Sequence, residues 1–234
     1  MTINEKNNKI SSFGEYIQKG YLNNIIKNIS ENKDDYIEEY NDIIFQITTS
    51  DNQKYNSNKN ISTIDLEKCE NILKEIYSIN ISLPLIIFKI DYKYPDLLIP
   101  IIGYEIYHPE NKSKLDLKYC NETIKLNIPV SIDENSLYKY DPNSEFYTDN
   151  CFSYTTDNGT DIILNDRKQE FKDNNMSLCE NNCTYINYDK NTKQSACSCY
   201  IKNKMDLISE ILIILINYLI IFLLKKVIKL IWIL

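Results

Sequence analysis

The chain has 234 residues, a formal net charge of -7 and a sequence pI near 4.9. This length can bury one sizeable core or two small ones. The acidic balance argues against nucleic acid as a partner, because phosphate binding needs a basic face. Only four glycines occur and no Gly-rich phosphate-binding motif is present, so we expect no nucleotide cofactor, nor any other.

Residues 1–42 are polar and predict a helical flank or linker. Apolar side chains recur there at rough helical spacing, at Tyr16, Ile17, Leu22, Ile25, Ile26 and Ile29. A solvated helix face is predicted at Asp34, Asp35, Glu38 and Glu39. The first twenty residues contain no apolar run of signal-peptide length, and we expect the chain to be a fragment that lacks its upstream start.

Residues 43–137 predict a mainly β ectodomain. Four stretches rich in β-branched and aromatic residues are interpreted as strands: Ile43–Thr49, Leu85–Tyr92, Leu98–Tyr107 and Ile124–Ile132. An amphipathic helix is predicted over Leu66–Tyr77, with Asp65 as its N-cap. The fold class is therefore mainly β (α+β): a short-stranded sheet with one packed helix, followed by a disulfide-rich loop module and a C-terminal transmembrane helix.

Residues 138–204 predict a cysteine-rich, membrane-proximal module, and residues 205–234 a transmembrane helix with a short basic tail. The stretch from Ile211 to Leu234 is long enough to cross a bilayer, and Lys225, Lys226 and Lys229 favour a cytoplasmic C-terminus. A buried core helix and a membrane-surface helix are the alternatives. The lipid bilayer is thus the first expected partner, in a single-pass protein whose N-terminal region is extracellular or lumenal.

Seven cysteines predict a disulfide frame, because five of them fall after residue 150, where apolar residues are fewest. They are Cys69, Cys120, Cys151, Cys179, Cys183, Cys197 and Cys199. We expect Cys69 to pair with Cys120, and two bridges among the other five, with Cys197 and Cys199 reaching separate partners. One thiol is then left over. The alternatives are a zinc site at the last four cysteines, whose second spacing is tight for zinc, and buried reduced thiols.

Eight asparagines begin Asn-x-Ser/Thr triplets and are candidate glycosylation sites, where chance alone predicts about four. They are Asn28, Asn60, Asn80, Asn111, Asn121, Asn158, Asn175 and Asn182. An Asn-rich coding bias is the alternative explanation of the excess. Sequons, cysteines and a membrane segment all indicate the same secretory compartment.

No catalytic site is predicted, and no metal site. His108 is the only histidine, which excludes a histidine-based triad or metal cluster and favours a structural role in a turn. Oxygen ligands for calcium occur over residues 157–166, but the spacing is not that of an EF-hand, and Asn158-Gly159 is more simply a tight hairpin turn. Arg167 is the only arginine, and an ion pair or bidentate contact would need that residue type.

Several stretches are similar to a module of large cysteine-containing surface membrane proteins from AT-rich unicellular eukaryotes. They are Phe45–Ser50, Ile87–Asp91, Ile99–Pro109, Tyr140–Ser144, Tyr154–Asp161, Asn165–Lys168 and Cys197–Cys199. The resemblance covers residues 40–204. It implies an extracellular cysteine-bearing region followed by a hydrophobic segment, and it brings no assigned activity.

Taken together, the sequence predicts a membrane-anchored extracellular domain with a structural or interaction role at the cell surface and a surface protein or carbohydrate as its partner. Two alternatives stay open. One is a tail-anchored adaptor that faces the cytosol, with reduced cysteines. The other is a fragment of a larger surface hydrolase or receptor, whose functional residues lie outside this chain.

Overall fold

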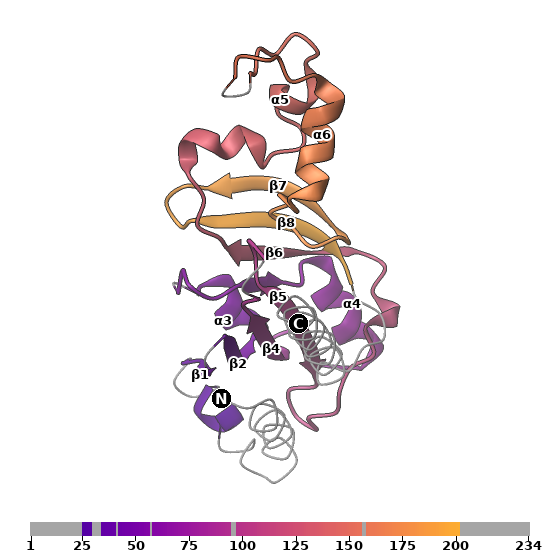
Figure 1. Ribbon diagram of the computed structural model, residues 1–234. Helices are drawn as coiled ribbons and strands as arrows, with labels where there is room; N and C mark the ends of the chain where they lie inside the picture. The colour runs from indigo at the N-terminus through magenta and orange to yellow at the C-terminus, as the bar shows by residue number, and fades with distance from the viewer. Residues whose placement is uncertain are drawn as a thin grey trace, which may run out of the picture.

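Two four-stranded antiparallel sheets form the framework of the protein in a computed structural model (Figure 1). The structure describes residues 25–29, 34–40, 42–56, 58–94, 97–155 and 158–201. Sheet A has the strand order β1-β2-β4-β5 and sheet B the order β3-β6-β8-β7. The mainly β class is confirmed, with two sheets in place of the single sheet that we expected.

Sheet A contains β1 (Tyr36–Tyr40), β2 (Ile43–Thr49), β4 (Ile86–Tyr92) and β5 (Ile101–Tyr107). Every residue of β2 and β4 is buried, as expected for apolar, β-branched strands in the middle of a sheet. The predicted strand at 43–49 is confirmed. The helix face predicted at Glu38 and Glu39 is wrong: both residues are exposed on the edge strand β1, where strand pairing overrides the local helical pattern.

Sheet B contains β3 (Thr63–Asp65), β6 (Thr123–Pro129), β7 (Cys183–Asp189) and β8 (Gln194–Tyr200). The loop-rich character predicted for residues 138–204 is wrong for β7 and β8, which pair with each other and, through β8, with β6. The boundary predicted at residue 138 runs through sheet B, because two of its strands lie on each side of that residue.

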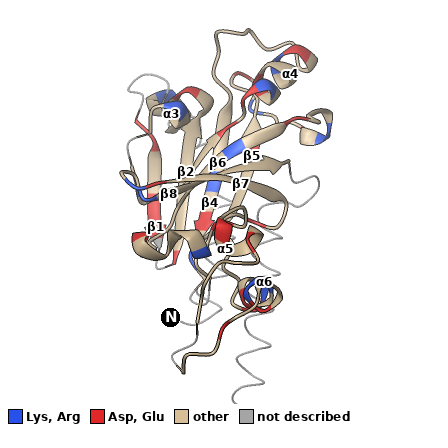
Figure 2. Ribbon diagram, turned by 90° about the horizontal axis from the view of Figure 1, so that it is seen from above, with Lys and Arg blue, Asp and Glu red and all other residues tan. Residues whose placement is uncertain are grey.

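Short helices connect the strands. They are α3 (Ser50–Lys54), α4 (Lys68–Ile76), η1 (Leu117–Tyr119), η2 (Glu134–Lys139), α5 (Glu145–Thr148) and α6 (Leu164–Asp173). The helix predicted over Leu66–Tyr77 is α4, but the N-cap predicted at Asp65 is wrong. The N-cap position is Glu67, and Asp65 accepts from the N–H of Glu67 in the turn before the helix. Charges of both signs lie along α4 and α6 (Figure 2).

The main core lies between the two sheets and α4. Its members are buried apolar residues of both sheets together with Cys69 and Leu73 of α4, neither of which is exposed to solvent. On the other face of sheet A, Phe88 packs with Ile26 and Ile29 of the helical segment 25–29. Sheet A is therefore buried on both faces near its centre, which explains the continuous burial of β4.

A buried ion pair lies on the face of β4 that points toward sheet B. Lys89 Nζ is 3.0 Å from Asp91 Oδ1, and both side chains are 1% exposed. Ser62, just before β3, accepts from Lys89 Nζ through its carbonyl at 2.6 Å and donates its hydroxyl to Asp91 at 2.6 Å. Burial lowers the pKa of Lys89, and the carboxylate of Asp91 opposes that shift.

A lobe over residues 134–173 lies beyond sheet B, at the end of the molecule opposite sheet A (Figure 1). Arg167 of α6 is fully buried there and donates to the carbonyls of Phe152 at 2.7 Å and Asp149 at 2.8 Å. Its guanidinium carbon is 5.2 Å from the ring centroid of Phe146. The bidentate contact that was predicted to require arginine is made with two main-chain carbonyls, and aromatic rings pack against the guanidinium.

Among the described residues, no helix has the length and apolar character needed to cross a membrane. The predicted transmembrane segment 205–234 lies outside the described residues, as does most of the predicted flank 1–42.

We expect Asp91→Asn to lower the free energy of unfolding by about 3 kcal/mol, because it leaves the buried ammonium of Lys89 without a countercharge while keeping the side-chain shape. Urea titration followed by circular dichroism measures the loss. Lys190→Ala is the control, since it removes an exposed 3.8 Å contact with Glu134, and it should cost less than about 1 kcal/mol. Equal costs for the two variants would contradict a structural role for the buried pair.

We expect Arg167→Lys to destabilise the lobe by about 2 kcal/mol, because an ammonium cannot hold both carbonyls and one charge-assisted hydrogen bond is lost. Limited proteolysis should then cleave the chain within residues 134–173 earlier than within the two sheets. The neighbouring exposed residue provides the control: Lys168→Ala should stay within about 0.5 kcal/mol of the wild type. A lobe as resistant in Arg167→Lys as in Lys168→Ala would show that the bidentate contact is dispensable.

Candidate functional site

Three disulfides join the segments around the core. Cys69 of α4 is bonded to Cys120, which precedes β6, across 51 residues of sequence. Cys179 is bonded to Cys197, and Cys183 to Cys199, so β8 carries two bridged cysteines with separate partners. The predicted pairing of Cys69 with Cys120 is confirmed, as is the separation of Cys197 from Cys199. The four cysteines of the zinc alternative are all bonded to each other in pairs.

Cys151 is the thiol left over, and it is exposed in the lobe. All eight sequon asparagines are exposed: Asn28, Asn60, Asn80, Asn111, Asn121, Asn158, Asn175 and Asn182. Two of them, Asn80 and Asn111, accept through Oδ1 from the hydroxyl of the serine two residues later, at 2.8 Å and 2.7 Å. No sequon asparagine is therefore hidden by the fold from a modifying enzyme.

His108 caps a turn, as predicted. Its Nδ1 accepts from the main-chain N–H groups of Glu110 at 3.1 Å and Asn111 at 3.4 Å, and only 8% of the residue is exposed. Gly159 has a φ of +78° in a loop that an antiparallel bridge between Thr155 and Asp161 closes, in agreement with a turn at Asn158-Gly159. Over the described residues, no three histidine, cysteine or acidic side chains gather as metal ligands would.

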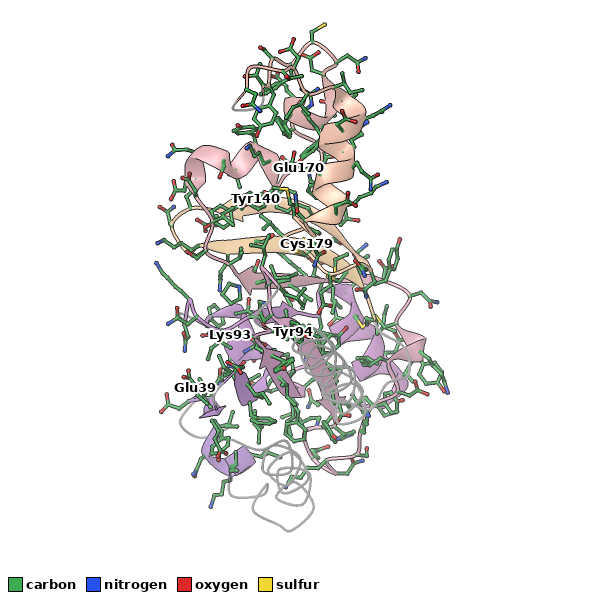
Figure 3. All side chains as sticks on the ribbon, viewed as in Figure 1. Glu39, Lys93, Tyr94, Tyr140, Glu170 and Cys179 are labelled. Atoms are coloured by element: carbon green, nitrogen blue, oxygen red, sulfur yellow. A yellow bond between two sulfur atoms is a disulfide. The ribbon has the colours of Figure 1, made fainter. Side chains whose placement is uncertain are left out.

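A groove of about 640 Å³ opens where loops of the two sheets meet, and we call it the lysine groove. Its walls come from the loop before β3, the connection between β4 and β5, the end of β6 and the β7–β8 turn. The lining residues are Lys59, Asn60, Lys93, Leu97, Leu98, Ile99, Pro100, Pro129, Val130, Ser131, Asn191, Thr192 and Lys193. Figure 3 labels Lys93 on the β4 side, toward the sheet A end of the molecule.

A smaller hollow of about 370 Å³ lies beside the lysine groove and shares Leu97, Leu98 and Ile99 with it. Its other wall is the segment 175–182, which the Cys179–Cys197 bridge fastens to β8. Residues 97–99 are thus open on two sides. Because the bridge holds one wall, the disulfide frame contributes directly to the shape of this surface.

Three lysines give the lysine groove a basic rim in an acidic protein. Lys59, Lys93 and Lys193 are exposed, and Lys59 Nζ donates to the carbonyl of Asn191 at 2.9 Å. The N–H of Asn191 lowers the pKa of Asp189, and the charge of Lys59 adds to that shift. The groove can therefore attract anionic groups, and its leucines and prolines can hold apolar ones.

Sequence reasoning missed both the lysine groove and the buried ion pair. The pair left a signal, because Lys89 and Asp91 alternate with isoleucine in a buried strand and therefore share one face. No pattern in the sequence indicated the groove. Leu98, which lines it, was predicted to lie in a strand, but that strand begins only at Ile101. The buried amine of Lys89 cannot meet a substrate, since it is 1% exposed and bonded to Ser62 and Asp91.

No protein-family model, curated protein or solved structure matches this chain.

We expect alkylation of the unreduced protein from a secretory host to label Cys151 alone. Peptide mapping by mass spectrometry should find the other six cysteines in the pairs 69–120, 179–197 and 183–199. Cys151→Ser should abolish the label and leave the unfolding free energy within about 0.5 kcal/mol, since it changes an exposed side chain. Labelling of any bridged cysteine before reduction would contradict the frame.

Proposed function

We propose that this protein is a membrane-anchored surface domain that serves in binding or structure, with its N-terminal part extracellular or lumenal. The observation that carries the proposal is the set of three close cysteine pairs. Structural disulfides form and persist in oxidising compartments and are rare in the cytosol. Loop-entropy arguments give about 4 kcal/mol for the 51-residue bridge and about 3 kcal/mol for each of the other two.

The exposure of all eight sequon asparagines fits this location. Exposure alone is weak support, because most asparagines in any protein lie at the surface. One sequon even has a separate explanation, since the serine that follows Asn60 is Ser62, a buried partner of Asp91. Sequons and bridges nevertheless require the same compartment, and their combination favours the lumenal side over the cytosolic adaptor.

A binding role is favoured over catalysis by the kind of surface that the chain offers. The lysine groove is broad and combines apolar with basic groups, while the lone histidine is committed to a turn. Surfaces that combine apolar and basic groups in this way suit a transient contact with another macromolecule. The anchor that we propose is the hydrophobic segment 205–234 of the sequence.

The proposal is tested by expressing the full chain in a eukaryotic secretory host and isolating its microsomes. We expect the intact mass to fall on enzymatic removal of N-glycans, and the chain to stay in the membrane pellet after alkaline carbonate extraction. The matched control is a chain that ends at Lys204. It should keep the fold and its three bridges but leave the pellet.

The outcomes separate the competing hypotheses. A carbonate-resistant chain with no glycan and seven free thiols would contradict the lumenal location and support the adaptor that faces the cytosol. A glycosylated chain that carbonate extracts as fully as the truncated control would contradict the anchor and leave a secreted domain.

A further inference from the structure

We propose that the lysine groove binds an extended peptide segment of a partner protein in which acidic residues alternate with apolar ones. The inference rests on the proposed binding role and names the ligand class for one surface. The groove unites loops of both sheets, and none of the described residues that line it is acidic.

The charges point to an anionic ligand. Within the described part of the chain, neither Lys93 nor Lys193 forms an ion pair. The positive charge of Lys59 is partly compensated, because its ammonium donates a hydrogen bond to the Asn191 carbonyl and lies near the carboxylate of Asp189. The groove is thus a local positive region in a protein of net charge -7, and such a region raises the association rate of acidic segments.

The apolar wall points to a ligand with hydrophobic side chains between its charges. Leu98 is 39% exposed, Leu97 and Ile99 are half-buried, and Pro100 and Pro129 extend the same wall. A single exposed leucine needs no explanation, but here the apolar residues adjoin the lysines. In an extended peptide successive side chains point to opposite sides, so alternate carboxylates reach one rim together while the apolar residues meet the wall.

The main chain of the wall is also open to pairing. Residues 98–99 belong to no sheet, and the main-chain hydrogen bonds found among the described residues include none from Leu98 or Ile99. Exposed main-chain N–H and C=O groups are what an added extended strand uses for affinity, while pockets for alternate side chains give specificity.

Other anionic ligands fit less well. Nucleic acid is disfavoured by the acidic balance of the whole protein. An anionic carbohydrate would find the lysines but no aromatic ring among the lining residues on which a sugar could stack. The peptide uses both the lysines and the leucines, and it is therefore the ligand that accounts for the whole surface.

The test measures binding of a fluorescein-labelled peptide Leu-Glu-Leu-Glu-Leu to the full-length protein, purified in a mild non-ionic detergent and treated to remove any N-glycans. We expect Lys93→Glu combined with Lys193→Glu to weaken binding about tenfold, since two exposed ion pairs become repulsive. Leu98→Ser should weaken it by about threefold. Raising the salt from about 0.05 M to about 0.5 M should weaken it as well.

The matched control is Lys168→Glu combined with Lys172→Glu on α6, which makes the same change in net charge at exposed residues of the lobe. It should bind like the wild type, and Leu-Lys-Leu-Lys-Leu should not bind. The proposal is overturned if the two double variants weaken binding equally, or if the peptide fails to bind. It is also overturned if a sulfated oligosaccharide binds through Lys93 and Lys193 while the peptide does not.

This result is independent of the test of location. Peptide binding by the deglycosylated protein in detergent does not depend on which side of a membrane the protein faces, and removing the glycans also frees Asn60, which lies in the lining of the groove. If the test of location finds glycans and bridges and the peptide nevertheless fails to bind, the ligand class is rejected and the surface location stays intact.

Discussion

The contact of Lys89 and Asp91 with Ser62 constrains how the two sheets meet. A buried ammonium and carboxylate must keep their partners, because each would be costly to leave unpaired in a low-dielectric interior. The two charges belong to β4, at the centre of sheet A, and Ser62 leads into β3 of sheet B. Apolar packing between the sheets tolerates small displacements, whereas the four hydrogen bonds that join Ser62 to Lys89 and Asp91 do not. The pair therefore fixes the alignment that the surrounding isoleucines and leucines then fill.

The disulfides hold the parts of the fold that burial alone holds least. Most residues of β7 are exposed or half-buried, yet its first residue, Cys183, is bonded directly across the ladder to Cys199 of β8. The bridge between Cys179 and Cys197 fastens the segment before β7 to the core in the same way. Apolar area thus stabilises sheet A, while cross-links that restrict the unfolded chain support the polar half of sheet B.

The part of this architecture that was predictable from the sequence is the part in which local pattern and tertiary burial agree. The strand over Ile43–Thr49 is a continuous stretch rich in β-branched and apolar residues and is buried throughout. The helix around Cys69 has apolar residues at helical spacing and buries Cys69 and Leu73 on that face. β8 has no such pattern, because serine, alanine and cysteine occupy its buried positions. Its strand structure comes from pairing with β6 and from the bridges, which are long-range. β1 was missed for the same reason, since its pairing with β2 overrides a polar, helical-looking sequence.

The lysine groove shows why a binding surface can escape prediction in a sequence whose strands can be predicted. Its three lysines are far apart in the chain, at positions 59, 93 and 193, and each lies in a loop where lysine is ordinary. They come together only because the inner face of β4 aligns sheet A with sheet B and β7 turns into β8 at the same end. The buried charges that align the sheets and the exposed charges that line the groove are thus linked through the geometry of the strands between them. A change that lets the sheets shift would therefore alter the groove, since its walls come from loops of both sheets.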